Sequence, residues 1–174
     1  CERSPEQAVQ TNINGVQNVI AAASLNDVEI VIFTSSDKAV NPTNVMGTTK
    51  LMGERLMTAA NSSKRENGPI FASTRFGNVL GSSGSVIPIF RNQISNGGPV
   101  TLTDKNTTRF VMSVEEAVEL VLNSVMEAKG GEVFVTKMPV MKIEDLAIAM
   151  IEELAPNEIE VTEIGSKLGE KLYE

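Results

Sequence analysis

Two short apolar stretches constrain the fold of this chain more than any other feature. The four apolar residues at 30–33 follow one another without interruption inside an expected strand at 29–34, and a second buried strand is expected at 70–76. An unbroken apolar run is typical of a parallel strand that is covered on both faces. Amphipathic patterns lie before, between and after these strands, so the sequence predicts an α/β fold with a largely parallel sheet.

The helices are expected where apolar residues recur at helical spacing. The first begins at Ser4-Pro5, with Gln7 completing a capping box, and runs to about Ala23. The second runs from Asn44 or Val45 to roughly residue 60. Two further helices are expected at 85–95 and 142–154. Another opens at Ser113, with an expected buried stripe of Val118, Val121, Leu122 and Val125. The remaining expected strands are 100–102, 109–112, 132–136 and 159–163.

The composition excludes some classes of function. The 174 residues carry a net charge of −7, which argues against a nucleic-acid partner, since phosphate binding needs a basic face. The single cysteine, Cys1, excludes an internal disulfide and fits a reducing compartment. The chain starts with Cys1 and a helix rather than with methionine and a strand, so we expect it to be a piece of a longer protein.

Polar residues gather where the first strand is expected to end. Ser36, Asp37 and Lys38 follow the apolar run, and Lys50 lies one helical turn beyond Met46 on the second helix. Open α/β sheets bind ligands at such strand ends. Each residue alone is better explained by an ordinary role: a solvated turn, a core methionine or a surface lysine. The functional interpretation therefore depends on the whole string of residues.

That string resembles a known family. "TSSDKAVNPTNVMGTTKLMGE" is similar to the nucleotide-sugar 4,6-dehydratases, which are extended short-chain dehydrogenase/reductases of polysaccharide biosynthesis. Within that family it looks like the branch of large, membrane-anchored UDP-N-acetylglucosamine 4,6-dehydratases that carry methionine in place of the catalytic tyrosine. "EQAVQTNINGVQNVIAAA", "TRFGNVLGSSGSVIPIF", "TRFVMSVEEAVELV" and "GEKLYE" extend the resemblance over nearly the whole chain.

The resemblance implies a reaction and a set of catalytic residues. In the family, NAD+ oxidises the sugar at C4, water leaves across C5 and C6, and the hydride returns to C6. Ser36 then binds the C4 oxygen, and Asp37 protonates the leaving C6 hydroxyl. Lys38 takes part in removing the C5 proton. Such an elimination needs an acid and a base near one pair of carbon atoms.

The family also implies residues for the cofactor, NAD. Lys50 holds the nicotinamide ribose, and Met46 fills the space of the tyrosine without offering a proton, which leaves the route of the C4 hydroxyl proton open among Ser36, water and Lys50. Ser35, Phe76 and Asn78 are assigned to the same cofactor site. No metal is among the expected cofactors.

The UDP-sugar substrate is expected to lie on later residues. The resemblance assigns Asn78, Ser85, Val86, Arg109 and Glu170 to it, with Ser85 at a helix N-terminus suited to a diphosphate and Arg109 as its cationic partner. Residues 1–84 are accordingly expected to form the catalytic part of a truncated NAD-binding Rossmann domain. Residues 85–174 are expected to form mainly a small α/β substrate-binding lobe, with segments that return to the sheet.

One departure from the family pattern matters. The glycines of the sequence never fall into G-x-G-x-x-G, so the dinucleotide fingerprint is expected before residue 1. Alone, the chain is expected to bind NAD weakly and to be inactive. By resemblance we expect the whole protein to be cytoplasmic, anchored at the inner face of the bacterial membrane by N-terminal segments. We also expect a homo-oligomer that pairs helices 5–23 and 44–60 across a two-fold axis.

Two other functions stay open at this stage. A UDP-sugar 4-epimerase, or a dehydratase that also epimerises C5, would share most binding residues without the same need for Asp37 and Lys38. A non-catalytic sugar-nucleotide-binding module is favoured by Met46 and the missing glycine fingerprint, whereas the intact Asp37, Lys38 and Lys50 argue against it.

Overall fold

A computed structural model describes residues 1–82, 84–166 and 169–173 of the chain. Ser83 of the "TRFGNVLGSSGSVIPIF" motif and Glu174 of the closing "GEKLYE" motif lie outside the described residues. The chain divides into two compact units: Cys1–Phe76 with Glu115–Lys137, and Gly77–Val114 with Met138–Glu174. This division follows packing. The expected division after residue 84 separates cofactor and substrate roles, and it stays a prediction.

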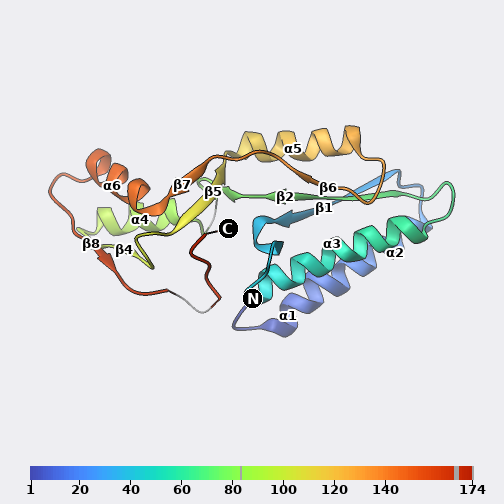
Figure 1. Cartoon of the computed structure of the whole chain (residues 1–174), viewed down its shortest axis with the longest axis horizontal. Coiled ribbons are helices and arrows are strands. Elements are labelled where there is room, and N and C mark those ends of the chain that lie inside the picture. The colour runs from blue at the N-terminus through green and yellow to red at the C-terminus, as the bar shows by residue number, and fades with distance from the viewer. Residues whose placement is uncertain (83, 167–168, 174) are drawn as a thin grey trace. The chain divides into compact units, whose positions relative to one another are not determined.

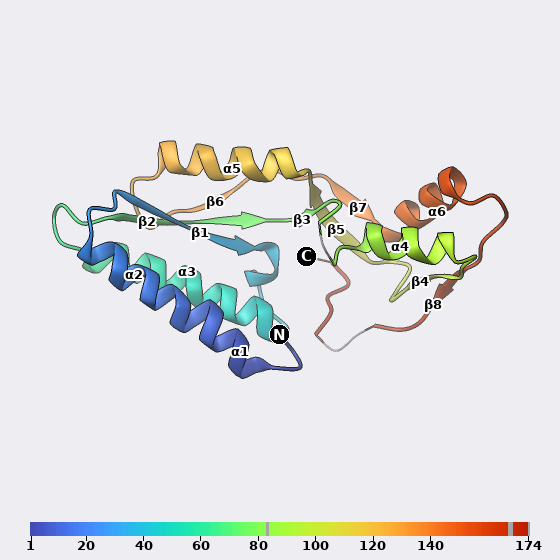
Figure 2. The same cartoon turned by 180° about the vertical axis from the view of Figure 1, so that it is seen from behind.

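The first unit is built on a parallel sheet. Strands β1 (Ile30–Ser36), β2 (Ile70–Phe76) and β6 (Val133–Val135) pair in the order β1-β2-β6, with all neighbours parallel. Helices α2 and α3 cover one face of this sheet, and α5 covers the other (Figures 1 and 2). The predicted α/β class with a Rossmann-type parallel sheet is confirmed.

The first predicted helix is continuous in sequence but not in geometry. It consists of α1 (Pro5–Val9), a π-helical turn η1 (Gln10–Asn14) and α2 (Gly15–Leu25). The predicted capping box is wrong, because Ser4 makes no side-chain capping bond. Proline at the first helical position has a preset φ and no N–H to satisfy, so this start forms without the box.

Helix α3 (Val45–Ser63) packs against the sheet on the same side as α2. Phe71 of β2 is completely buried between them, in a cluster with Ala23 of α2 and Met57 of α3. Burying a phenylalanine side chain contributes on the order of 1.5–3 kcal/mol. This apolar contact fixes α3, the helix that carries Met46 and Lys50, on the sheet.

Helix α5 (Val114–Glu127) corrects one prediction. Of the expected buried stripe, Val118 is 52%, Leu122 60% and Val125 37% exposed. The buried position is instead Ser124, whose hydroxyl donates to the Leu120 carbonyl. The helix has apolar residues on two adjacent faces, and the sheet can bury only one of them. Periodicity alone does not reveal which face is covered.

The second unit combines three short pairings of strands. A sheet of order β3-β5-β7 joins Asn78–Val79, Thr108–Met112 and Val140–Lys142, with β5 and β7 antiparallel, and β4 (Val100–Leu102) pairs with β8 (Val161–Glu163) in parallel. The sequence analysis missed β3 and β7, which are two and three residues long.

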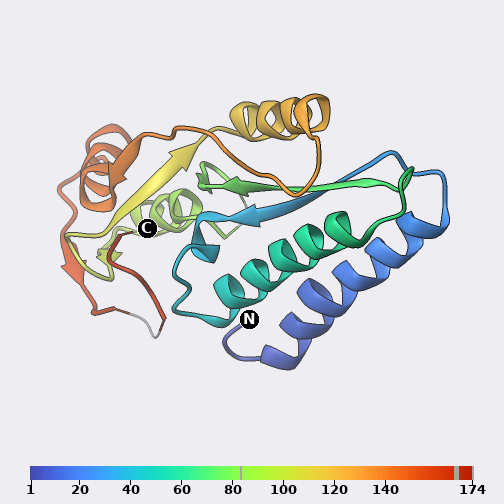
Figure 3. The ribbon, with the colours of Figure 1, turned by 45° about the vertical axis from the view of Figure 1, so that its right-hand side comes forward.

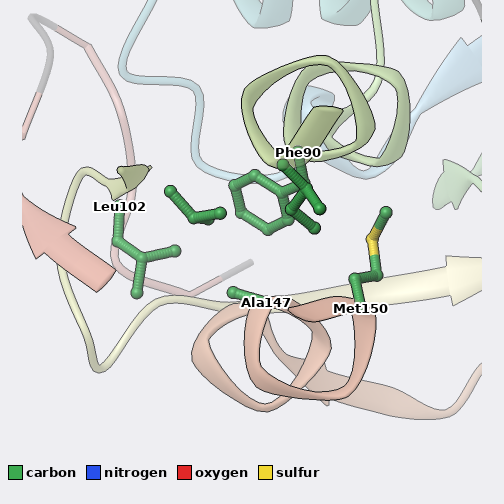
Figure 4. Packing of buried hydrophobic residues seen from close by; sticks show 6 residues of the cluster. Phe90, Leu102, Ala147 and Met150 are labelled. Carbon is green, nitrogen blue, oxygen red and sulfur yellow. The ribbon is translucent and has the colours of Figure 1, made fainter. Parts of the chain in front are cut away.

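Helices α4 (Val86–Ser95) and α6 (Ile143–Leu154) enclose the core of the second unit. Phe90 of α4, Leu102 of β4 and Ala147 and Met150 of α6 point toward one another in it (Figure 4). Phe90, Leu102 and Ala147 are almost completely buried. The described part of the chain contains no helix that is long and apolar enough to cross a bilayer. The predicted homo-oligomer stays a prediction.

Candidate functional site

The turn after β1 brings a hydroxyl, a carboxylate and an amine together. Ser36 ends the strand, and the 3₁₀ turn η2 (Asp37–Ala39) follows. Ser36 Oγ donates a hydrogen bond of 2.8 Å to Asp37 Oδ1, and Lys38 Nζ lies 3.0 Å from the same oxygen. Ser36 and Asp37 are buried, whereas the Lys38 side chain is 25% exposed. Two donors therefore fix the carboxylate at the carboxyl end of a parallel strand, where α/β sheets bind ligands.

The N-terminal end of α3 lies against this turn (Figure 3). Asn44 caps the helix, since its Oδ1 accepts a 2.8 Å bond from the Gly47 N–H. Gly47 approaches the Lys38 carbonyl so closely that a Cβ would overlap it. Only glycine permits this approach, which brings the first turn of α3 up to the Asp37–Lys38 pair.

Met46 and Lys50 lie one turn apart on α3. Lys50 Nζ donates a 3.0 Å bond to the Thr34 carbonyl and lies 5.0 Å from the centroid of the Phe33 ring. Burial lowers the pKa of the Lys50 amine below its ordinary value of 10.5, because the charged form loses hydration. Met46 is 36% exposed and has no ionisable group. Of the two, only Lys50 can carry or release a proton.

The sequence analysis missed a buried carboxylate one turn beyond Lys50. Glu54 is 2% exposed, and its Oε1 accepts a 2.6 Å bond from Ser35 Oγ. Arg75 reaches both carboxylate oxygens, with Nε 2.8 Å from Oε1 and Nη2 2.7 Å from Oε2. The hydrogen bonds that the Arg75 guanidinium donates to Glu54 raise its pKa. Spacing was the available signal, because Lys50 and Glu54 are four residues apart on one helix.

The other residues predicted for the cofactor stand near this group in the first unit or belong to the second. Ser35 is buried, with its hydroxyl donated to Glu54. Phe76 ends β2 directly across from Ser36 in the parallel register. The π-helical turn adds a contact that was not expected, since Asn12 Nδ2 donates a 3.0 Å bond to Thr49 Oγ1 on α3. The cofactor roles of Ser35 and Phe76 stay predictions.

The second unit contains a cavity of about 260 Å³. Its wall includes every residue that was predicted to bind the substrate: Asn78, Ser85, Val86, Arg109 and Glu170. Phe90 and Leu102 of the apolar core form other parts of the wall. An apolar cavity with a few convergent polar groups is the usual form of a small-molecule site.

The polar groups at this cavity differ in how they are satisfied. Asn78 Nδ2 donates a 3.0 Å bond to the Phe110 carbonyl. Ser85 precedes the first turn of α4, and its buried Oγ finds no hydrogen-bond partner among the described residues. Buried hydroxyls are nearly always paired. A polar ligand at the N-terminus of α4 would supply the missing partner.

Arg109 and Glu170 form an ion pair at the cavity wall. Arg109 Nη2 lies 3.2 Å from Glu170 Oε1, and Thr103 Oγ1 donates a 2.9 Å bond to the same oxygen. Arg109 Nη1 also donates to the carbonyls of Thr108 and Leu172. The guanidinium is thus oriented by three oxygen atoms of its own unit. Thr103 is a second residue that the sequence analysis missed.

The predicted residues therefore fall into two groups. The candidate catalytic residues gather around the end of β1 and the first turns of α3 in the first unit. The candidate substrate residues gather around one cavity in the second unit. Each group stands together in space although its members come from separate segments of the sequence.

Known proteins resemble this chain over its whole length. The model of a family described as polysaccharide biosynthesis protein matches residues 1–174. An uncharacterized membrane protein of Methanocaldococcus jannaschii is 52% identical over 100% of this chain and 54% of its own length. An inverting UDP-N-acetylglucosamine 4,6-dehydratase of Campylobacter jejuni is 45% identical over 99% of this chain and 51% of its own length. A UDP-glucose 4-epimerase of Rickettsia rickettsii is 42% identical, covering 100% and 51%.

Solved structures also superimpose on nearly the whole of this chain. The crystal structure of Pen from Bacillus thuringiensis superimposes with a TM-score of 0.95 at 50% identity, covering 99% of this chain and 54% of that one. DesIV from Streptomyces venezuelae, a dTDP-glucose 4,6-dehydratase with NAD and TYD bound, has a TM-score of 0.86 at 18% identity, covering 99% and 59%, and shows the fold alone. The chain spans about half the length of the curated relatives that it matches. It belongs to the polysaccharide biosynthesis protein family of extended short-chain dehydrogenase/reductases.

Proposed function

We propose that this chain is the catalytic and substrate-binding half of an NAD-dependent UDP-N-acetylglucosamine 4,6-dehydratase. The product is the 4-keto-6-deoxy sugar, a precursor for polysaccharide or glycan biosynthesis. The observation that carries the proposal is the cluster at the end of β1, in which Ser36 Oγ and Lys38 Nζ both contact Asp37 Oδ1. Dehydration requires an acid and a base at neighbouring carbon atoms, and this cluster supplies the pair.

The residues present fit the nicotinamide end of NAD. Lys50 offers an ammonium beside the carboxyl ends of the strands, at a partly buried position where its pKa is lowered. In this role it holds the ribose hydroxyls of the cofactor. When bound, NAD would accept a hydride from C4 of the sugar and later return it at C6. Residues for the adenosine end are not identified in this chain, which lacks the glycine fingerprint.

The geometry favours one answer to the missing tyrosine. The C4 hydroxyl passes its proton to Ser36 Oγ, while the Ser36 hydroxyl gives its own proton to Asp37 Oδ1 along the 2.8 Å bond. Asp37 becomes a neutral acid in this step, without any proton from Met46. Ser36 is unchanged at the end, and the C4 proton is stored on Asp37.

The stored proton then serves the elimination. Asp37 delivers it to the C6 hydroxyl, which leaves as water, and regains its negative charge. Protonation of Asp37 has meanwhile ended the ion pair with Lys38, whose ammonium then gives one proton to solvent and becomes the neutral amine that removes the C5 proton; it regains the solvent proton after the cycle. Lys38 returns that proton to C5 when the hydride reaches C6. The net change in the sugar is the loss of one water molecule.

The cavity of the second unit supports a nucleotide-sugar substrate. Arg109 offers a cation, and the N-terminus of α4 offers backbone N–H groups beside the Ser85 hydroxyl, for which the described residues supply no partner. A diphosphate has both the charge and the acceptor oxygens to use them. The volume of about 260 Å³ lies just below the usual range for ligand pockets, so the cavity takes part of a nucleotide sugar.

A 4-epimerase is the second candidate. The Rickettsia rickettsii relative, called UDP-glucose 4-epimerase, is 42% identical to this chain, nearly as similar as the Campylobacter jejuni dehydratase at 45%. An epimerase also exchanges a hydride at C4, but it loses no water. The Asp37–Lys38 pair would then have no elimination to perform.

Product analysis distinguishes the candidates. The full-length protein is incubated with NAD and UDP-N-acetylglucosamine, and the product is examined by proton and carbon NMR. Dehydration gives a methyl group at C6 and a ketone, or its hydrate, at C4. A C4 epimer with its C6 hydroxyl intact would instead establish the epimerase. Unchanged substrate that still binds the protein would point to a non-catalytic binding module.

A further inference from the structure

We propose that Glu54 is a positioning residue. Its carboxylate fixes the end of β1 relative to the first turns of α3, and so aligns the Ser36–Asp37 turn with Lys50. The inference rests on the proposed function for the roles of the residues that are aligned. Glu54 itself is buried and its contacts are with the protein, so it acts through its neighbours and not on the substrate.

Glu54 is connected to the ends of both β1 and β2 and to Lys50 on its own helix. Ser35, which donates to Glu54 Oε1 at 2.6 Å, directly precedes Ser36 in the chain. Lys50 and Glu54 are separated by one helical turn, so a shift of Glu54 along the helix axis moves Lys50 with it. Arg75 of β2 lies opposite Ser35 in the parallel register and donates hydrogen bonds to both carboxylate oxygens of Glu54. One side chain thus joins two strand ends to the helix.

Close packing surrounds the contacts of Glu54 with Ser35 and Arg75, which are called the joint below. Gly53, the neighbour of Glu54, faces the Phe33 ring so closely that a Cβ would overlap it. The same ring carries the Lys50 ammonium 5.0 Å from its centroid. At the start of the helix, a Cβ on Gly47 would likewise overlap the Lys38 carbonyl. Because packed contacts of this kind transmit displacements, a shift at Glu54 reaches the reacting groups.

A glutamine at position 54 keeps the volume of the side chain but replaces one acceptor oxygen with an NH₂ donor. In the present arrangement each carboxylate oxygen faces a donor of Arg75, and Oε1 also faces Ser35. An NH₂ at the Oε1 position faces Ser35 Oγ and Arg75 Nε, and an NH₂ at the Oε2 position faces Arg75 Nη2, so Glu54→Gln breaks at least one of these contacts without creating a cavity.

The experiment compares Glu54→Gln with Met57→Ala in the full-length protein. Met57 is equally buried on α3 but packs in the apolar cluster with Ala23 and Phe71, so its truncation destabilises the same helix without touching the joint. For each variant we measure melting temperature, turnover number, KM for UDP-N-acetylglucosamine, and amide hydrogen exchange of segment 34–40.

We expect Glu54→Gln to lower the turnover number by about 10²-fold, the cost of displacing a reacting group by about 1 Å. The KM for the UDP-sugar should stay unchanged, and exchange in segment 34–40 should rise. Met57→Ala should lower the melting temperature at least as much, yet keep the turnover number near that of the wild type. Ser35→Ala, which removes one arm only, should act in the same direction as Glu54→Gln, and the two effects should not add.

Two results would overturn the inference. One is wild-type exchange in segment 34–40 together with wild-type turnover in Glu54→Gln. The other is an equal loss of turnover in Met57→Ala, which would reduce Glu54 to general stabilisation. If Glu54→Gln fails to fold, Ser35→Ala decides by the same measurements. If the wild-type protein shows no dehydration, the proposed function fails, whereas the exchange comparison still judges the role of Glu54.

Discussion

The polar residues of the two units are organised in different ways. In the first unit, the candidate catalytic groups Ser36 and Lys38 are both bound to Asp37, and the buried Glu54 nearby is bound to Ser35 and Arg75. In the second unit, the polar groups border a cavity of about 260 Å³, and the buried Ser85 hydroxyl finds no partner among the described residues. The polar groups of the first unit are thus paired with one another, whereas the cavity of the second unit leaves room for a ligand beside the Ser85 hydroxyl.

This difference suggests a division of labour. Groups that move protons gain from fixed positions, since a site that is already organised does not have to reorganise during the reaction. Groups that bind a substrate must instead leave room for it, and the Ser85 hydroxyl, which has no partner among the described residues, can pair with a ligand when it arrives. Changes in the first unit should therefore affect mainly turnover, and changes in the second should affect mainly affinity.

The largest effect is expected at Asp37. Asp37→Asn keeps the shape of the side chain and removes its ability to store a proton. Turnover should fall by roughly 10²–10⁴-fold, the usual contribution of a general acid, while the dissociation constant for the UDP-sugar stays the same. Single-turnover kinetics and calorimetric titration of the full-length variant measure the two quantities. Wild-type turnover in this variant would refute the role assigned to Asp37.

The next largest effect is expected at Arg109, and it should have the opposite character. Arg109→Met keeps the apolar stem and removes a cation from the cavity wall. A hydrogen bond to a charged group contributes about 1.5–3 kcal/mol, which corresponds to roughly a 10- to 150-fold loss of affinity for the UDP-sugar. Turnover at saturation should change little. Arg91→Met, at an exposed arginine on α4 outside the described lining of the cavity, is the matched control. Equal losses in both variants would argue against a specific diphosphate contact.

The lowered pKa of Lys50 leads us to expect that the reaction rate depends on pH. Burial lowers the pKa of this lysine below 10.5. Because the protonated amine is the form that holds the ribose hydroxyls, the rate should fall as pH rises through this lowered pKa. Lys50→Arg stays protonated over the whole accessible range, so its basic limb should move to higher pH. Rate profiles of the full-length protein between neutral pH and about pH 10.5 test this, and identical basic limbs would exclude Lys50 as their source.

Met46 should give the smallest effect. Met46→Leu conserves volume at a partly exposed position and removes no proton donor, and swaps of this kind usually cost less than about 1.5 kcal/mol. Turnover should therefore fall far less than in Asp37→Asn, with an unchanged melting temperature. A larger loss than that of Asp37→Asn, in a folded protein, would show that the thioether does more than fill the place of a tyrosine.

Sequence patterns were informative where the local chain dictates the outcome. The strands at 70–76 and 100–102 have the predicted bounds, and α3 begins at Val45, one of its two expected starts. The resemblance also singled out residues that come together in space, such as Ser85, Arg109 and Glu170 around one cavity. Strand runs and motifs are encoded by neighbouring residues, so a single sequence can reveal them.

The tertiary structure decided what depends on distant residues. Glu54 looks like a solvated helical acid until Ser35 and Arg75 are brought against it by the pairing of β1 with β2. The exposed row on α5 reflects which of two apolar faces meets the sheet. The sequence by itself determined the α/β class, the family and the candidate residues. Which groups are paired, buried or left open depends on contacts between segments far apart in the chain, and only the folded arrangement sets those.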